Sequence, residues 1–144
     1  MSTPEGRVKA KVTRWLKDLG EDCWYFMPVQ SGFGRPALDY ECTIHGLAVA
    51  IETKAPGGEM SPTQRATRDT KLRAGGLVLM IWDDTSLNTC KEIVRGIVPW
   101  PLFGAYLSQE ARDIYQEHLK VVLAGKAPKS STGRNNGASG ATPQ

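Results

Sequence analysis

The chain lacks the features that mark membrane-spanning and secreted proteins. No apolar run reaches the roughly 18 residues that a membrane helix needs, and the first residues, MSTPEGRVKAKV, contain no apolar stretch of the secretory type. The three cysteines are odd in number and far apart in the sequence, which does not suggest a disulfide framework. We therefore expect a cytoplasmic protein with reduced thiols and no membrane partner.

Several common catalytic motifs are also missing. The sequence contains no Ser/His/Asp or Cys/His arrangement, no zinc-ligand spacing and no glycine-rich P-loop. Its two histidines do not suit a catalytic base, because His45 lies in a predicted turn and His118 on an apolar helical stripe. Any reaction must therefore depend on other side chains.

Net positive charge is small and confined to the end of the chain. The formal charge is +3, and residues 125–144 carry three basic residues and no acid, which leaves residues 1–124 at zero. The terminal stretch, GKAPKSSTGRNNGASGATPQ, has no large apolar residue and is predicted to be a disordered tail. Residues 1–124 are long enough for one domain with a hydrophobic core, and phosphate affinity there would require a local site.

Hydrophobic periodicity and turn residues divide that domain into helices and strands. We expect helices at residues 4–19, 62–74, 86–94 and 107–122, and strands at residues 23–29, 38–44, 47–54 and 77–82. The segment VPWPLF is interpreted as a connection rich in proline and aromatic residues. Strand, helix and buried strand between residues 47 and 82 form a β-α-β crossover.

The two central strands are separated only by His45 and Gly46, the spacing of a tight hairpin. A two-residue turn pairs residues whose numbers sum to 91, so Asp39 lies opposite Glu52. Strand alternation then gives one apolar face and one face that carries the charged residues Asp39, Glu41, Glu52 and Lys54.

Opposed carboxylates indicate a cation site. Directly paired side chains have Cβ atoms about 5 Å apart, where like charges destabilise the sheet unless a cation compensates them. Mg²⁺ prefers oxygen ligands and needs only one or two carboxylates at a phosphate-handling site. Lys54 on the same face could orient an attacking water or neutralise phosphate charge. The alternative is an ordinary solvated strand face.

Other candidates have simpler structural explanations beside the functional one. Glu5 lies along the buried stripe of the first helix and could supply a carboxylate, although acids favour a first helical turn in any case. Gln64 could bind phosphate or a water, but it also completes a capping box with Ser61. Phe33 is a loop aromatic that could stack on a base. Candidate phosphate contacts, each also explicable as a solvated charge, are Arg35, Arg7, Lys9, Lys11 and Arg14.

Taken in order, Glu5, the segment GRPALD ending at Asp39, the segment IETK ending at Lys54, and SPTQ ending at Gln64 resemble the VRR-NUC branch of the PD-(D/E)xK nuclease superfamily. The resemblance covers residues 4–83. It implies a restriction-endonuclease-like α/β core of order α-β-β-β-α-β, with a mixed central sheet flanked by helices. One departure is Leu38, which precedes Asp39 where family members usually have proline.

The resemblance also implies site roles. Mg²⁺ or Mn²⁺ would bind Asp39, Glu52 and the Thr53 carbonyl, with Lys54 catalytic and with Glu5 and Gln64 assisting. The resulting hypothesis is a metal-dependent endonuclease that hydrolyses DNA phosphodiester bonds, with structure selectivity for branched DNA such as four-way junctions. Similarity to short phage and bacterial members implies a homodimer in the cytosol of a bacterium or a phage-infected host.

Two alternatives remain open from the sequence. A non-catalytic DNA-binding or assembly module with the same fold would bind metal without cleaving any substrate. A nuclease of this fold could instead act on linear duplex DNA, nicked DNA or RNA, since no residue pattern here reads base edges or a 2′-hydroxyl.

Overall fold

A mixed β-sheet with helices on both faces forms the centre of the molecule. The computed structural model describes residues 3–29, 34–100 and 104–129. Its elements are α1 (Pro4–Asp18), the 3₁₀ turn η1 (Gly20–Asp22), β1 (Cys23–Phe26), β2 (Tyr40–Ile44), β3 (Leu47–Thr53), α2 (Pro62–Arg73), β4 (Leu77–Ile81), α3 (Asp84–Arg95), β5 (Ile97–Trp100), β6 (Gly104–Leu107) and α4 (Gln109–Ala124).

The main sheet has the strand order β1-β2-β3-β4. The β1–β2 and β2–β3 pairs are antiparallel, whereas β3 and β4 run parallel and are joined through α2. This arrangement confirms the expected α-β-β-β-α-β order and the mixed sheet. None of the described helices is long and apolar enough to span a membrane.

Local capping explains where the helices begin. The hydroxyl of Thr3 accepts a hydrogen bond from the amide of Gly6 at 3.0 Å, and Pro4 occupies the first turn of α1. Helix α3 begins at Asp84, two residues before the expected start at Ser86. The reason is that Asp83, not Ser86, is the cap, and its carboxylate accepts from the amide of Ser86 at 2.8 Å.

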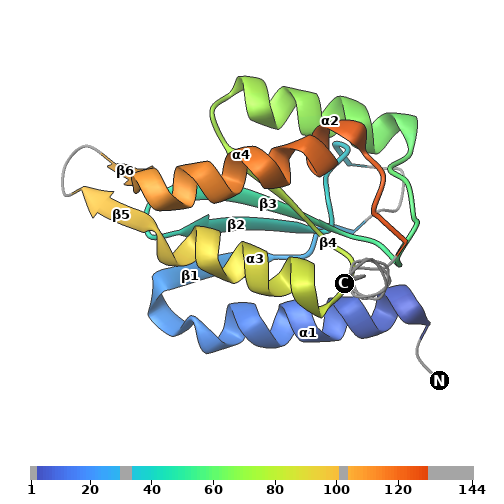
Figure 1. Ribbon diagram of the computed structural model, residues 1–144, viewed down its shortest axis with the longest axis horizontal. Coiled ribbons are helices and arrows are strands. Elements are labelled where there is room, and N and C mark those ends of the chain that lie inside the picture. The colour runs from blue at the N-terminus through green and yellow to red at the C-terminus, as the bar shows by residue number, and fades with distance from the viewer. Residues whose placement is uncertain (1–2, 30–33, 101–103, 130–144) are drawn as a thin grey trace, which may run out of the picture.

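Both faces of the sheet are covered, as Figure 1 shows, with α1 and α3 on one side and α2 and α4 on the other. The first face carries the larger core, which includes Tyr40, Ile51 and Leu79. The second face has its own core, which includes Leu38, Ala50 and Met80. The expected apolar face is confirmed by the first core, whereas the second face is only partly charged, because small and apolar residues there pack under the helices.

The segment expected to be a connection instead forms a hairpin. Strands β5 and β6 pair antiparallel, with Ile97 opposite Leu107 and Pro99 opposite Ala105. A two-stranded sheet accommodates Pro99 because proline is tolerated on an edge that needs no donor. At the other end of the fold, β1 stops at Phe26, three residues before the expected end, and Phe33 lies outside the described residues.

The packed body extends past residue 124. Gly125 ends α4 with a φ of 67°, in the left-handed region that glycine adopts without strain. The chain then returns along the loop after β3, where the amide of Met60 donates to the carbonyl of Gly125 at 2.8 Å. Ala127 donates to Gly58 at 2.8 Å and is buried. The tail boundary expected at residue 125 thus moves beyond residue 129, and residues 130–144 lie outside the described part.

Candidate active site

The β2–β3 hairpin has the register expected from its two-residue turn. His45 and Gly46 both have positive φ, at 51° and 90°, and the paired residues run from Ile44 opposite Leu47 to Tyr40 opposite Ile51. The next position along the same register brings Asp39 to Glu52, where the Asp39 amide donates to the Glu52 carboxylate at 3.2 Å. The hairpin turn therefore places two carboxylates side by side.

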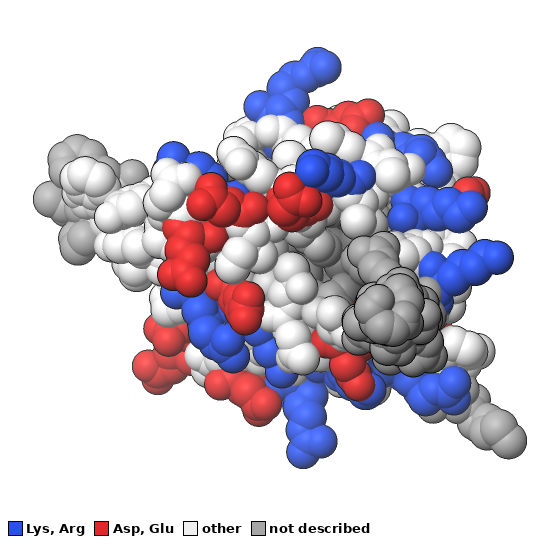
Figure 2. All heavy atoms as spheres, viewed as in Figure 1, with Lys and Arg blue, Asp and Glu red and all other residues white. Residues whose placement is uncertain are grey.

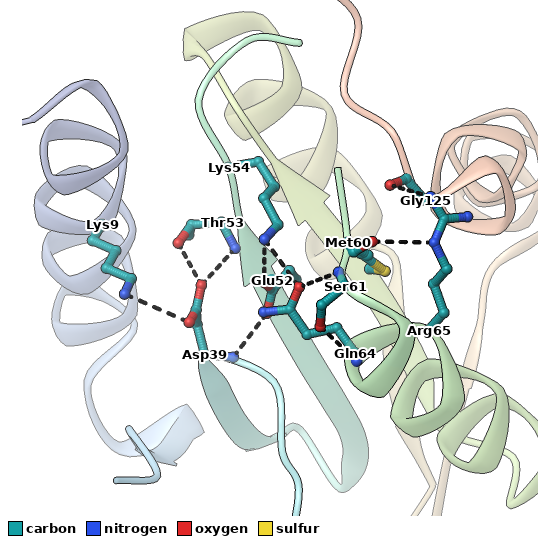
Figure 3. A network of polar contacts seen from close by, with 10 residues as sticks. All are labelled: Lys9, Asp39, Glu52, Thr53, Lys54, Met60, Ser61, Gln64, Arg65 and Gly125. Carbon is teal, nitrogen blue, oxygen red and sulfur yellow. Dashed lines mark hydrogen bonds and ion pairs between the residues drawn. The ribbon is translucent and has the colours of Figure 1, made fainter. Parts of the chain in front are cut away.

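The Asp39 carboxylate is held by three contacts from two residues, Thr53 and Lys9 (Figure 3). Its Oδ2 accepts from the Thr53 amide at 2.9 Å and from the Thr53 hydroxyl at 2.6 Å. Its Oδ1 lies 3.5 Å from the ammonium of Lys9, which reaches across from α1. Two fixed donors and one cation hold this carboxylate in a set orientation.

Glu52 is one of the most buried polar residues described, with 1% of its side chain exposed. Its Oε2 lies 3.2 Å from the ammonium of Lys54. Burial, followed by the negative charge of Asp39, raises the pKa of Glu52 to about 7, while Lys54 acts in the opposite direction. An ordinary solvated strand face is excluded for Glu52, because a carboxylate on such a face would be exposed to water.

Lys54 links the carboxylate pair to the start of α2. Its ammonium donates to Oε1 of Gln64 at 3.0 Å, and the same oxygen accepts from the amide of Ser61 at 2.9 Å. Ser61 in turn accepts from the Gln64 amide, which completes the capping box. The capping role of Gln64 is confirmed, and the same oxygen also contacts Lys54. Its predicted contact with phosphate or a water stays a prediction.

The donor set fits a hard divalent cation. Asp39 and Glu52 supply two carboxylates, and their mutual repulsion contributes to the raised pKa of Glu52, so a cation between them would relieve it. Thr53 contacts Asp39 through its amide and hydroxyl. Among the described residues no three His, Cys, Asp or Glu side chains gather closely enough to hold a metal ion, so Glu5 does not join the pair in this structure.

The predicted phosphate contacts lie in two separate places. Arg35 is exposed on the loop before Asp39, where it lines a groove beside α2. Arg7 and Lys11 line a cavity of about 320 Å³ next to Trp82 on the far side of the sheet. Lys11 forms an ion pair of 2.7 Å with Asp84 of α3. Neither Arg35 nor Lys11 has a hydrogen bond or ion pair with the carboxylate pair among the described contacts.

Lys9 belongs to the network although sequence reasoning gave it only a general phosphate contact. Its ammonium pairs with Asp39, and its carbonyl accepts from the hydroxyl of Tyr40 at 2.9 Å. The useful signal was helical spacing, because Lys9 lies one turn after Glu5 on the side that was expected to approach the site.

The face of the molecule drawn in Figure 2 carries side chains of both charges. Figure 2 shows acidic side chains interspersed with basic ones over the face formed by α3 and α4. Phosphate recognition on that described surface would therefore depend on individual residues rather than on a continuous positive field.

Comparisons with known proteins bear on the fold. No protein-family model and no curated protein matches the chain. Among solved structures, one described as a VRR_NUC domain aligns with a TM-score of 0.55 and 19% sequence identity, covering 63% of this chain and 97% of that chain. The chain has the fold of a VRR_NUC domain. This restriction-endonuclease-like fold confirms the predicted fold class.

Proposed function

We propose that this VRR_NUC-like chain is a divalent-metal-dependent nuclease that hydrolyses DNA phosphodiester bonds. The observation that carries the proposal is the pairing of buried Glu52 with Asp39, with the Lys54 ammonium 3.2 Å from the Glu52 carboxylate. A solvent-excluded carboxylate that repels one charged neighbour and attracts another is typical of catalytic sites. The VRR_NUC fold supports the same reaction class.

Asp39 and Glu52 are the residues that would hold Mg²⁺ or Mn²⁺, and the Thr53 carbonyl and Glu5 are proposed as further ligands. When bound, such an ion lowers the pKa of water and offsets charge on a phosphoryl oxygen. The Thr53 hydroxyl and amide fix Asp39, and Glu52 fixes Lys54, so the protein groups are oriented before substrate arrives.

Lys54 is proposed to act directly on the reacting groups. Its side chain is 13% exposed, so the ammonium can face a phosphate while it remains held by Glu52 and Gln64. In that position it would orient the attacking water and stabilise negative charge on the scissile phosphate. Gln64 would assist by holding the ammonium in place.

The preferred substrate in this proposal is branched DNA such as a four-way junction, cut by a homodimer. The junction substrate and the homodimer both follow from the resemblance to short VRR-NUC proteins. In such a dimer each of the two active sites would cut one of two strands. Arg35, Arg7 and Lys11 would contact phosphates, since all three side chains line open grooves or cavities.

A substrate panel tests the proposal. The chain and its Glu52→Gln variant are incubated with labelled four-way junction, flap, linear duplex, single-stranded DNA and RNA in Mg²⁺, Mn²⁺ or EDTA. Cleavage by the wild-type chain alone, and only with a divalent ion, is expected. Metal binding without cleavage of any substrate would contradict the enzyme and favour a non-catalytic module, while preference for linear DNA or RNA would overturn the junction assignment.

A further inference from the structure

A groove of about 890 Å³ begins next to the catalytic residues and runs between α2 and β1. One wall is a single face of α2, whose lining residues recur at helical spacing from Thr63 to Thr70. The other wall is the loop from Gly34 to Ala37, and Phe26 of β1 also lines the groove. Apart from Lys71, the α2 residues on this face have small side chains, which keeps the groove open.

Residues that line the groove adjoin the site residues along the chain. Thr63 directly precedes Gln64, which holds Lys54, and Ala37 lies two residues before Asp39. A linear molecule that lies along the groove would therefore pass beside the carboxylate pair at one end.

The far end of the groove presents aromatic surface. The ring of Phe26 is 46% exposed, and the ring of Trp24, 61% exposed, lies against it with centroids 5.4 Å apart. Both side chains project from the sheet face that α2 covers elsewhere, because they pair across β1–β2 with Glu41 and Thr43. Exposed aromatics beside a groove are the stacking platforms on which proteins bind unpaired bases.

Charge also favours an unpaired strand over a duplex. The charged residues that line the groove are Arg35, Lys71 and Glu41, and the last two form an ion pair, so the lining carries one net positive charge. Duplex binding depends mainly on many phosphate contacts, which this lining does not offer. Bases that stack on aromatic rings need few phosphate contacts.

We propose that this groove binds a single-stranded segment of DNA, with bases stacked on Trp24 and Phe26 and a phosphate at Arg35. This inference rests on the proposed nuclease function and changes its substrate: among branched DNAs it favours one with an unpaired arm next to the scissile bond over a fully paired four-way junction. A fully paired end would not enter the groove.

The test is binding of labelled oligonucleotides by fluorescence anisotropy in EDTA, which prevents metal-dependent cleavage. The probes are a single strand, a duplex with a single-stranded overhang and a blunt duplex. Trp24→Ala is expected to weaken binding of the first two about tenfold or more, with little change for the blunt duplex. Trp24→Phe should restore most of the affinity, and the slope of log K against log salt should be shallow, about −0.7 for each phosphate contact.

Trp100→Ala is the matched control, because Trp100 is similarly exposed at 53% but lies on β5 outside the groove. Equal affinities of the Trp24→Ala and Trp100→Ala variants for single strands would overturn the inference. The inference would also be overturned if Trp24→Ala changed the oligomeric state measured by sedimentation but left the DNA affinity unchanged. That result would show that Trp24 lies in a contact between two copies of the chain. Cleavage of the same probes in Mg²⁺ tests the proposed nuclease activity separately. Cleavage without Trp24-dependent binding would refute only the single-strand binding by the groove. Trp24-dependent binding without cleavage would refute only the nuclease activity.

Discussion

Glu52 and His118 are two buried ionisable residues that both neighbour Met80, yet their surroundings differ. Glu52 pairs with Met80 across β3–β4, and His118 accepts a hydrogen bond from the Met80 amide at 3.1 Å. Burial favours the neutral form of each: the pKa of Glu52 rises to about 7, and that of His118 falls to about 4. Burial and a shifted pKa alone therefore do not distinguish a site from a core.

The neighbours make the distinction. His118 stacks parallel to Trp82 with ring centroids 6.2 Å apart, and its ring lies 3.7 Å from the Cys90 thiol, so uncharged groups surround it. Glu52 lies between a second carboxylate and an ammonium. Competing charges around a buried group are typical of functional sites, whereas uncharged partners are typical of core packing.

The largest effect that would sharpen this comparison is loss of cleavage on neutralising Glu52. Glu52→Gln removes the buried negative charge and is expected to lower the cleavage rate about 10³-fold. His118→Gln should reduce stability but leave the rate of the folded protein unchanged, measured with the same labelled substrate. A similar loss of rate in both variants would contradict the distinction.

The next effect concerns stability and pH in metal-free buffer. Folding raises the pKa of the Glu52 carboxyl from 4.5 to about 7. The folded state is therefore destabilised as the pH rises above 4.5, the pKa in the unfolded chain, and the full cost of about 3 kcal/mol is reached above pH 7. Glu52→Gln removes this cost, so it should be more stable than wild type at pH 8 and equally stable near pH 4.5. Urea unfolding at both pH values measures the difference, in which the contribution of His118 cancels. A difference independent of pH would refute the raised pKa.

Removal of the neighbouring ammonium should have a smaller effect on rate. Lys54→Ala is expected to lower cleavage about 10²-fold, because charge on the phosphate loses its protein cation, and Lys54→Arg should retain part of the activity. Lys120→Ala is the control, since Lys120 pairs with Glu117 on the exposed surface of α4. Full activity of Lys54→Ala would show that this lysine only offsets the charge of Glu52.

The smallest effect separates the two roles of Gln64. Gln64→Ala removes the contact with Lys54 and half of the capping box, so we expect about a tenfold loss of rate and about 1 kcal/mol of stability. Ser61→Ala also breaks the cap but leaves the side chain that contacts Lys54. It should lose similar stability with normal activity in parallel assays, and an equal loss of activity would assign Gln64 to the cap alone.

The hairpin could be predicted because its information is local. His45 and Gly46 set the register, and the register alone brings Asp39 to Glu52. The depth of Glu52 could not be predicted, because it depends on α2 and α4 packing over a strand face whose alternation suggested exposure.

Long-range packing accounts for the other differences. Lys9 reaches Asp39 only through the placement of α1 against the sheet, which spacing within the helix does not fix. Strands β5 and β6 have only four residues each, and β5 contains Pro99. Neither the alternation of apolar residues nor the composition therefore distinguished them from a loop. Ala127 packs into the second core from a stretch whose composition suggested disorder.

The central claim is that the charges around Glu52 form a site for a divalent cation, and titration of the purified chain with Mn²⁺ by calorimetry at pH 7.5 tests it most directly. Saturable binding to wild type, lost in Glu52→Gln and retained in His118→Gln, is the predicted result. Equal Mn²⁺ affinity of wild type and Glu52→Gln, or no binding to either, would contradict it.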